Sequence, residues 1–430
     1  MNERLAILAG IRTPQAKAFG ALADVPAVAL GRHAVTALME RVGLPSEQVE
    51  EVVFGNVAGP PDAANIARVI TLMAGLPQST IAHTVNRNCG SGMEAIAAAW
   101  QAILTGRSKL AIAGGVESMS NIPMLLSRSL QGKLMAAARA KTYWQKLRAW
   151  AAMRPRDFKP MHGLRLGLTD PVCGLNMGET AEVLAAEFDI SRQDQDQFAL
   201  DSHRRAVAAQ QACFLSGEIA PIDVGGKPIE ADIGPRSGQT LEQLAALRPI
   251  FRAAHPDRQP TITAGNSCGI TDGATALLVA AESTAAQLGI APLAYVRRVA
   301  VAGCDPRRMG LGPVFAMAKL LRETGMEISD FDLFEINEAF AAQVLACLAA
   351  MDSDAFAQQY LDRPHRLGAV DRQRLNVHGG AIALGHPVGA SGARIVLTLA
   401  RALRQQGGGI GIASLCIGGG QGMAMLVETQ

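Results

Sequence analysis

Cys89 is the residue in this sequence best placed to act as a nucleophile. It lies in VNRNCGSGMEAI (85–96), between polar residues that end a predicted strand and a Gly-Ser-Gly that opens a predicted helix. A helix N-terminus stabilises a thiolate, and its backbone N–H groups can bind a developing oxyanion. A free cysteine is otherwise a small hydrophobic residue, usually buried and inert. The rest of the chain decides between these interpretations.

Three further segments carry residues that a thiol nucleophile would need. EINEAFAAQ (335–343) places Asn337 between a strand and a helix, where it could also be a simple N-cap. NVHGGAIALGHPVGASGAR (376–394) holds His386 between Gly-rich turns, and histidine is the natural general base for a thiol. LCIGGGQG (415–422) places Cys416 at a strand end before three glycines, where a second thiol could work as a general acid or base. This set favours a chemical role for Cys89.

An internal repeat predicts how these residues are brought together. An amphipathic helix, a glycine, an acidic turn and a short strand occur at 28–56 and again at 313–338, with Gly43 and Gly325 at an offset of 282. Residues 89–117 and 389–417 are also alike, at an offset of 300. The difference of 18 residues is expected in 351–370 (MDSDAFAQQYLDRPHRLGAV). The repeat indicates a duplicated α/β unit whose pseudo-twofold axis brings Cys89 and the 389–417 region into one cleft.

The bulk composition limits the class of protein. The chain has 430 residues, of which 49% are hydrophobic and 18% charged, so it is globular and long enough for more than one core. A net charge of +2 gives no reason to expect a nucleic-acid partner. The seven cysteines include no C-x-x-C pair, which suggests neither a disulfide framework nor a zinc site. No signal peptide or membrane span is expected, and a cytoplasmic compartment fits.

The segment 128–165 has a composition unlike its surroundings. Its single acid is Asp157, and tryptophans, leucines and methionines are interleaved with its basic residues. The ten basic residues are Arg128, Lys133, Arg139, Lys141, Lys146, Arg148, Arg154, Arg156, Lys159 and Arg165. Basic helices with aromatic residues often lie on membranes or on partner surfaces. A solvated lid over the active site is the alternative, because the apolar residues form no single clean stripe.

Six segments in order resemble the thiolase family over nearly the whole chain. They are NCGSGMEA, GGVESMS, TITAGNSCGITDGA, NEAFAAQ, GGAIALGHPVGASGAR and CIGGGQG. The resemblance implies an α/β class and the thiolase fold, with duplicated five-layered α/β/α/β/α halves and an inserted loop domain. It also implies acyl transfer between coenzyme A thioesters, by a homodimer or tetramer. The domains expected are 1–120 and 251–290 for the first half, 121–250 for the loop domain with its basic insertion, and 291–430 for the second half.

The resemblance implies a role for each candidate catalytic residue. Cys89 resembles the acylated nucleophile, His386 the base that activates it, and Cys416 the second cysteine that moves a proton to or from the acetyl carbon or coenzyme A. Asn337, together with His386, resembles the holder of a water in a first oxyanion hole. The backbone N–H groups of Cys89 and Gly418 resemble the second hole.

Coenzyme A contacts are expected mainly from the loop region. NMGETAE (176–182) implies Met177, and GPRSGQTLEQLAALRPIF (234–251) implies Arg236 near the nucleotide. The TAGNSCG turn implies Ser267 and Cys268 along the pantetheine arm, and NEAF implies Phe340. Two residues depart from the family. Cys268 stands where Ser is common. His378 stands in NVHGG where NVNGG is usual. The His378 side chain could line the pocket, but we favour a packed imidazole.

The basic insertion is most similar to that of thiolase β subunits in fatty-acid-oxidation multienzyme complexes. That similarity implies thiolysis of 3-ketoacyl-CoA by coenzyme A in β-oxidation, with a hydratase/dehydrogenase α subunit and membrane contact through 128–165. GHPVGASGAR also resembles acetoacetyl-CoA thiolases, so short-chain Claisen condensation is an alternative. A thiolase-like acyl-CoA- or lipid-binding protein without turnover is a second. No metal and no resident cofactor are predicted, with coenzyme A and acyl-CoA as substrates.

Overall fold

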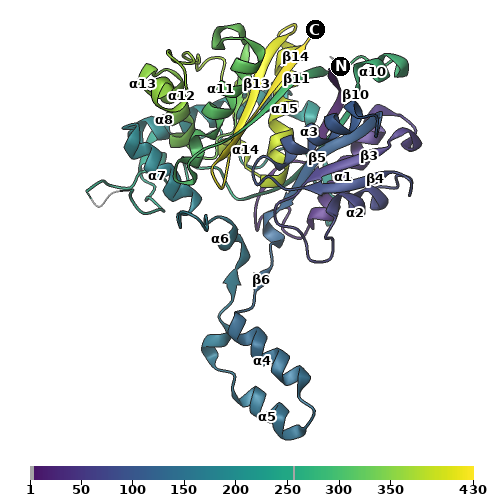
Figure 1. The fold of residues 1–430 in the computed structure, drawn as a ribbon, viewed down its shortest axis with the longest axis vertical. Coiled ribbons are helices and arrows are strands. Elements are labelled where there is room, and N and C mark those ends of the chain that lie inside the picture. Colours follow the sequence, from purple (N-terminus) through teal and green to yellow (C-terminus); the bar gives the residue numbers. More distant parts are fainter. Residues whose placement is uncertain (1–3, 255–256) are drawn as a thin grey trace.

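A single hydrogen-bonded sheet joins the two ends of the chain in the computed structural model, which describes residues 4–254 and 257–430 (Figure 1). Its strand order is β12-β13-β14-β11-β1-β10-β5-β3-β4, with β2 paired to β10. The strands are β1 (Leu5–Arg12), β2 (Ala16–Lys17), β3 (Glu51–Gly55), β4 (Ile81–Val85), β5 (Leu110–Ser118), β10 (Thr271–Ala281), β11 (Ala294–Gly303), β12 (Leu333–Ile336), β13 (Gly409–Ile417) and β14 (Gln421–Thr429). β1 and β11 pair antiparallel in the middle, so each half of the chain forms one side of the sheet.

The strand registers confirm the internal duplication. Outward from the β1–β11 pair, the order β1-β10-β5-β3 is repeated as β11-β14-β13-β12. Val52 of β3 lies opposite Ile112 of β5, and Phe334 of β12 lies opposite Ile412 of β13. Positions 52 and 334 differ by 282 and positions 112 and 412 differ by 300, which are the two offsets found in the sequence.

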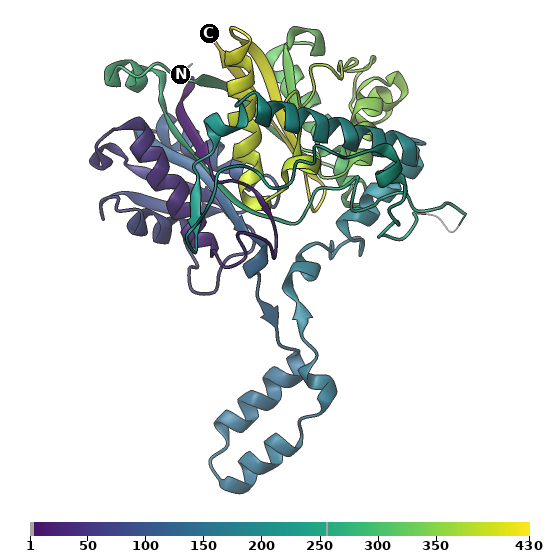
Figure 2. The ribbon, with the colours of Figure 1, turned by 180° about the vertical axis from the view of Figure 1, so that it is seen from behind.

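Helices cover both halves and fill the space between them, which makes five α/β/α/β/α layers across the two halves together (Figures 1 and 2). α1 (Ala27–Val42) and α2 (Ile66–Met73) pack on the outer face of the first half, and α11 (Gly312–Thr324) packs on the outer face of the second. α3 (Ser91–Leu104) and α15 (Val388–Gln405) form the middle layer, and α15 contacts strands of both halves. The predicted fold class is therefore confirmed.

Two glycines related by the offset of 300 let α3 and α15 touch. A Cβ atom at Gly92 would lie 2.7 Å from the backbone N of Ala393, and one at Gly392 would overlap the backbone N of Met93. The two contacts are related by the same offset, as a pseudo-twofold axis between the helices requires. Both helices begin at this crossing, so the loops that precede them, which hold Cys89 and His386, enter the same region.

The 18 extra residues of the second half do not all fall in 351–370, so that prediction is wrong in part. Phe334 forms a parallel bridge with Leu375, as Val52 pairs with Ala82 in the first half. The offset between positions 82 and 375 is 293, which is 11 more than 282 and 7 fewer than 300. The remaining seven residues therefore enlarge the loop between Leu375 and α15, which holds His386.

The remaining elements lie mainly in the loop region and around the second half. The helices are α6 (Gly163–Gly167), α7 (Met177–Glu187), α8 (Arg192–Gln211), α9 (Leu241–Ala245), α10 (Glu282–Leu288), α12 (Ala341–Met351), α13 (Asp354–Tyr360) and α14 (Ala381–Leu384), and a short ribbon joins β8 (Ile222–Val224) to β9 (Lys227–Ile229). Short 3₁₀ turns occur at Ser46–Gln48, Met119–Asn121, Pro155–Phe158, Leu215–Glu218, Pro306–Leu311 and Ile328–Asp330. We keep the domain boundaries expected at 120, 250 and 290 as a prediction.

The basic segment forms a helical hairpin that projects away from the body (Figures 1 and 2). A two-stranded ribbon of β6 (Met124–Leu125) and β7 (Met161–His162) carries the antiparallel helices α4 (Arg128–Arg139) and α5 (Tyr143–Ala151). Asp157 is 4% exposed and fastens the hairpin, since it accepts hydrogen bonds from Ser129 Oγ at 2.8 Å and Arg154 N at 2.8 Å and pairs with Lys133. None of the helices in the described ranges has both the length and the hydropathy that crossing a bilayer requires.

Candidate active site

Cys89 lies in the short loop between β4 and α3, one residue before the Gly90 cap of the helix. Asn88 takes a left-handed backbone conformation, with φ of 44°, and its side-chain amide donates to Gly418 O at 2.7 Å. This bond ties the nucleophile loop to the Gly-rich turn after β13. Left-handed non-glycine residues are uncommon and often mark functional loops.

Burial and nearby backbone amides act on the pKa of the Cys89 thiol in opposite directions. Burial raises its pKa, and hydrogen bonds from the N–H groups of Gly418 and of Cys89 itself lower it by a smaller amount. The expectation that the helix N-terminus lowers the thiol pKa is therefore wrong in this structure, because desolvation outweighs the amides. A thiol that stays protonated at neutral pH needs a base. The two amides that lower the thiol pKa, those of Gly418 and Cys89, are the pair expected to form the second oxyanion hole.

His386 is held in a neutral form with one ring nitrogen free. Its Nδ1 lies 2.6 Å from Ser391 Oγ, and that hydroxyl donates its single proton to Pro387 O at 3.0 Å. Ser391 therefore accepts from Nδ1–H, which leaves a lone pair on Nε2. Burial, followed by the charge of Arg394, lowers the His386 pKa to about 4. Nε2 is enclosed and has no hydrogen-bond partner among the described residues, as a base awaiting its substrate proton would.

Asn337 directly follows β12, and among the described residues both polar atoms of its side chain are unpartnered. Its backbone N–H donates to Ser414 O at 2.9 Å, which fixes the residue beside β13. Its Oδ1 and Nδ2 are buried, and neither has a hydrogen-bond partner within the part of the chain that the structure describes. Burying an amide without partners is costly, so the site is built for a polar ligand or a water. This fits the water-holding role that the resemblance implies.

Cys416 lies at the end of β13, beneath a small apolar cluster. It is 1% exposed, and the cluster includes Phe340 and Met309, with Met177 and Phe251 packed against it. Burial raises the pKa of Cys416 well above its ordinary value, and the charges of Cys89, Cys347 and Cys268 add to the effect. The second thiol is therefore protonated at neutral pH and able to act as an acid.

The 261–274 segment connects the other parts of the site. Cys268 N–H donates to Ala339 O at 3.0 Å, and Ser267 forms an isolated antiparallel β-bridge with Phe340. These contacts fasten the segment to the NEAF turn. Further along, Thr271 Oγ1 accepts from His386 N–H at 3.1 Å. Cys268 is a third thiol near Cys89, and burial followed by the charge of Cys89 raises its pKa to about 12.

The residues expected to bind coenzyme A fall into two groups. Some lie beside the catalytic residues, and Arg236 lies on the exposed surface. Met177 lies over Gly418, since a Cβ at position 418 would be 3.2 Å from its sulfur, and Phe340 shares its apolar cluster with Cys416. Arg236 is exposed on the loop before α9, and its guanidinium donates to Gln239 Oε1 at 3.4 Å. Among the described residues it forms no ion pair, so its charge is available to a phosphate.

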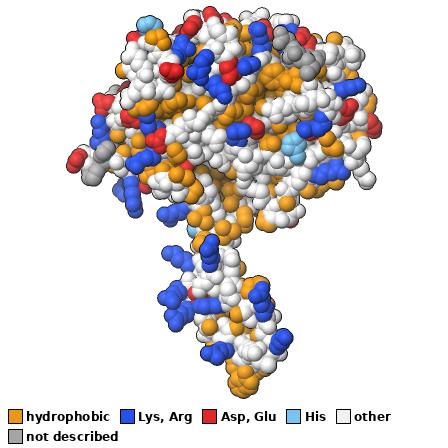
Figure 3. All heavy atoms as spheres, viewed as in Figure 1, with side chains coloured by type: hydrophobic (Ala, Val, Ile, Leu, Met, Phe, Trp, Pro, Cys, Tyr) orange, Lys and Arg blue, Asp and Glu red, His pale blue; other side chains and the backbone are white. Residues whose placement is uncertain are grey.

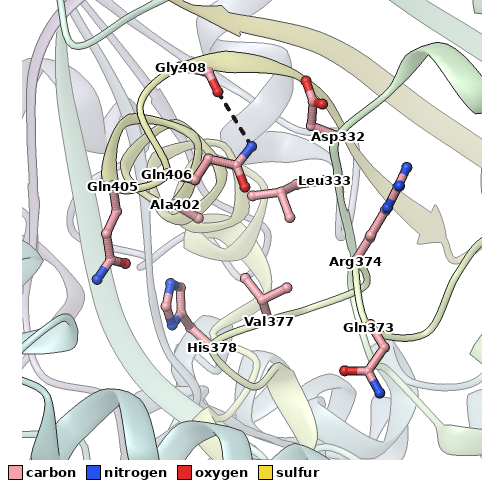
Figure 4. Close-up of a pocket in the computed structure, with 10 residues that line it drawn as sticks. All are labelled: Asp332, Leu333, Gln373, Arg374, Val377, His378, Ala402, Gln405, Gln406 and Gly408. Atoms are coloured by element: carbon pink, nitrogen blue, oxygen red, sulfur yellow. Dashed lines mark hydrogen bonds between the residues drawn. The ribbon is translucent and has the colours of Figure 1, made fainter.

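His378 lies at the end of β12 that is opposite to Asn337. Its ring stacks on Phe214 with a centroid separation of 3.6 Å, and burial lowers its pKa to about 4, which fits the packed imidazole favoured above. It also lines an open hollow of about 750 Å³ beside the first residue of β12 and the last turn of α15, whereas Asn337 follows the other end of β12 (Figure 4). The hollow is lined by Asp332, Leu333, Gln373, Arg374, Val377, His378, Ala402, Gln405, Gln406 and Gly408.

Sequence reasoning missed the residues that hold the catalytic groups in place. Ser391, Thr271 and Glu117 each make a buried hydrogen bond to the catalytic loops. Glu117 carried a signal, because it is a lone acid in the otherwise uncharged strand LAIAGGVES. Within residues 4–254 and 257–430, no group of three or more His, Cys, Asp or Glu side chains is arranged to hold a metal ion. The absence of a resident cofactor stays a prediction.

The chain belongs to the thiolase family. The thiolase N-terminal domain matches residues 5–283, and the thiolase C-terminal domain matches residues 290–429.

Named relatives cover the full chain. The 3-ketoacyl-CoA thiolase of Yersinia enterocolitica is 40% identical over 432 residues, which span 100% of this chain and 98% of the relative. The corresponding protein of Erwinia tasmaniensis is 39% identical over 430 residues, which span 99% of this chain and 97% of the relative. Human mitochondrial 3-ketoacyl-CoA thiolase in complex with CoA has a TM-score of 0.85 at 36% identity, covering 100% of this chain and 98% of that one. A Bacillus anthracis acetyl-CoA acetyltransferase matches equally well, with a TM-score of 0.85 at 35% identity and full coverage of both chains.

Proposed function

We propose that this protein is an acetyl-CoA C-acyltransferase that cleaves 3-ketoacyl-CoA with coenzyme A in fatty-acid β-oxidation. The observation that carries the proposal is the surroundings of Cys89, a thiol whose pKa is raised by burial, in a site whose buried neutral histidine has a free Nε2 among the described residues. The relatives named 3-ketoacyl-CoA thiolase, 39–40% identical over the full chain, support this choice of substrate.

The first half-reaction forms an acyl-enzyme. His386 Nε2 takes the proton from Cys89, and the thiolate attacks C3 of the 3-ketoacyl-CoA. As the C2–C3 bond breaks, the electron pair goes to the acetyl-CoA enolate, whose oxygen is stabilised by His386 and by a water held on Asn337. Cys416 then protonates C2, and acetyl-CoA leaves.

The second half-reaction returns the enzyme to its starting state. Cys416 takes the proton of free coenzyme A, whose sulfur attacks the acyl carbon on Cys89. The amides of Cys89 and Gly418, which both lower the pKa of the thiol, stabilise the oxyanion of the tetrahedral intermediate. The Cys89 thiolate leaves and recovers its proton from His386. The cycle is ping-pong and needs no metal or redox cofactor.

We assign the coenzyme A contacts by their place along the substrate. Met177 and Phe340 lie beside Cys416 and suit the thioester end and the pantetheine arm. Ser267 and Cys268 belong to the strip between the NEAF turn and His386, which suits the same arm. Arg236 is exposed and suits the phosphates of the nucleotide.

We also propose that the 128–165 hairpin binds an anionic membrane surface. Ten basic residues accompany aromatic side chains that point into solvent, with Tyr143 73%, Trp144 75% and Trp150 58% exposed. Figure 3 shows basic side chains spread over the hairpin and apolar ones at its end. Such a surface matches lipid headgroups and the acyl boundary beneath them. The projection of the hairpin away from the body disfavours the lid interpretation.

Vesicle sedimentation tests the hairpin. Wild-type protein is expected to bind vesicles containing phosphatidylglycerol and not vesicles of phosphatidylcholine alone. The double change Trp144→Ala and Trp150→Ala is expected to weaken binding with thiolysis unchanged. Equal binding by this variant would contradict membrane docking and leave a protein partner, such as a hydratase/dehydrogenase subunit, as the ligand of the hairpin.

A cytoplasmic homodimer or tetramer is the assembly we propose. Leu72, Met73 and Ile81 are exposed on α2 and the sheet-edge strand β4, which provides an apolar edge for a second copy. Light scattering of the purified chain tests the oligomeric state.

Acetoacetyl-CoA synthesis is the second candidate function. The same residues operate in both directions, and the similarity to the Bacillus anthracis acetyl-CoA acetyltransferase is as high as that to the human thiolase. Thiolysis rates on 3-ketoacyl-CoA substrates of increasing chain length, with mass spectrometry of Cys89, separate the two. Rates that rise with chain length and an adduct on Cys89 support β-oxidation. Activity on acetoacetyl-CoA alone would favour the short-chain reaction, and no turnover with no adduct would favour a binding protein.

A further inference from the structure

Glu117 is a fully enclosed carboxylate that none of the catalytic steps uses. It lies near the end of β5 and is 1% exposed. Its Oε1 accepts from Asn56 Nδ2 at 3.0 Å and Ala58 N at 3.1 Å, and its Oε2 accepts from Val57 N and Gly389 N, both at 3.0 Å. All four donors are neutral, and among the described residues no Lys, Arg or His forms an ion pair with it. A buried charge without a counter-ion is costly and rarely kept without a purpose.

The four donors come from both halves of the duplicated fold. Asn56, Val57 and Ala58 follow β3 in the first half, whereas Gly389 lies in the first turn of α15 in the second half. The backbones meet closely here, since a Cβ at Gly389 would lie 2.5 Å from Val116 O and 3.0 Å from Glu117 Oε2. Glu117 is therefore a bridge between the halves at the depth of the active site.

Each end of this bridge leads to a catalytic residue. Gly389 lies three residues after His386 and two before Ser391, which holds the imidazole. On the other side, a Cβ at Gly55 would lie 2.5 Å from the carbonyl carbon of Ser91, so the end of β3 packs on the first turn of α3, directly after Cys89. The charge of Glu117 also contributes to the raised pKa of the Cys89 thiol, which places the carboxylate within electrostatic reach of the sulfur.

We infer that Glu117 is a positioning residue that sets the separation of Cys89 and His386 by holding the 56–58 loop and Gly389 on one carboxylate. The inference rests on the proposed roles of Cys89 and His386. Nucleophile and base come from different halves, and a displacement of about 1 Å between them costs about 100-fold in rate.

The chemistry of the bridge requires both oxygens and the full side-chain length. Each oxygen accepts from two N–H donors, so a glutamine amide in either orientation turns an NH₂ group toward two donors. An aspartate keeps the charge but is shorter by about 1.5 Å, so it cannot reach both halves at once.

Glu117→Gln and Glu117→Asp test the inference, with Glu51→Gln as the matched control. Glu51 is also 1% exposed and lies on the neighbouring strand, but it begins β3 at the opposite end of the strands and pairs with Arg107. Thiolysis is measured at about pH 8.5, because burial raises the pKa of Glu117 to about 7 and the carboxylate is then ionised. Both Glu117 variants are expected to lose about 10- to 100-fold in kcat with KM for coenzyme A nearly unchanged, whereas the control keeps its kcat.

The pH dependence of Cys89 alkylation separates the effect of the side-chain length of Glu117 from the effect of its negative charge. Removing the charge in Glu117→Gln is expected to lower the midpoint, because the carboxylate raises the thiol pKa, whereas Glu117→Asp keeps the charge and the midpoint. Folded Glu117 variants with wild-type kcat, or a fully active Glu117→Asp, would overturn the inference. If neither Glu117 variant folds, Asn56→Ala is used in their place, because it removes one of the four donors to the carboxylate. A wild-type kcat in Asn56→Ala would then overturn the inference. A wild-type enzyme without a Cys89 adduct would instead overturn the proposed function.

Discussion

Replacing Ser391 by alanine tests whether a serine fixes the tautomer of the catalytic base. In the wild-type protein Ser391 Oγ accepts from His386 Nδ1–H at 2.6 Å, because its own proton goes to Pro387 O at 3.0 Å. The change removes that acceptor, and the buried Nδ1–H is left unpaired.

The size of the effect follows from the cost of an unpaired buried donor. That cost is about 1–3 kcal/mol, and it can be relieved when the imidazole turns or changes tautomer. In either case the lone pair of Nε2 is no longer available to accept the proton of Cys89. Since 1.4 kcal/mol corresponds to a factor of ten in rate, kcat is expected to fall about 5- to 150-fold.

Steady-state thiolysis and the rate of Cys89 alkylation at pH 7 measure this effect together. Both are expected to fall, because the same base activates the thiol in each. Thr398→Val is the control, since Thr398 is a buried hydroxyl further along α15 that bonds to Glu218 at 3.2–3.3 Å, well after the turn that holds His386. A folded Ser391→Ala enzyme with wild-type kcat and alkylation rate would refute the assignment of the proton to Nδ1.

Three further outcomes follow from the buried polar groups. Cys416→Ala is expected to leave acylation of Cys89 intact and to slow turnover about 100- to 10,000-fold, which rapid-quench mass spectrometry would show; loss of the adduct itself would contradict the division of roles. Asn337→Leu is expected to raise Tm while lowering kcat, because it removes two unpartnered buried atoms that only substrate and water can satisfy; a lower Tm would contradict this account. His378→Asn is expected to reduce the loss of stability on acidification. The pKa of His378 is lowered to about 4 in the folded state, so the unfolded chain binds more protons between about pH 6.5 and 4, and stability falls as pH decreases through that window. Urea unfolding at several pH values measures the difference, which is small because the side chain is only half-buried, and parallel curves would count against it.

The sequence predicts the fold and the reacting groups because both leave short-range signals. Cys89, Asn337 and Cys416 each lie at or just after the end of a strand, and His386 lies in a Gly-rich loop before a helix, so local pattern is enough to select them. The offsets of 282 and 300 are recovered as strand registers, because a duplicated sheet must keep its pairing.

The missed features depend on contacts that are distant in sequence. Ser391 supports His386 only once the loop is folded, and Glu117 meets Gly389 across 272 positions. The direction of the Cys89 pKa shift depends on how much the site is desolvated, which a helix N-terminus in the sequence does not reveal. The apolar residues of 128–165 form no single stripe because the segment is two short antiparallel helices, exposed on most sides.

The division of labour between the two halves explains why the repeat is imperfect where the chemistry occurs. At the offset of 300, Cys89 corresponds to Gly389, so the second half has no thiol at the position of the nucleophile. The loop that leads to Gly389 is longer by seven residues, and this extra length carries His386 into the site beside the first half. Nucleophile and base can meet only when α3 and α15 cross at Gly92 and Gly392, where a side chain would push the helices apart. Alignment of the two loops therefore depends on how the two halves pack against each other. Glu117 accepts hydrogen bonds from both halves, and holding them together offsets the free-energy cost of burying its charge.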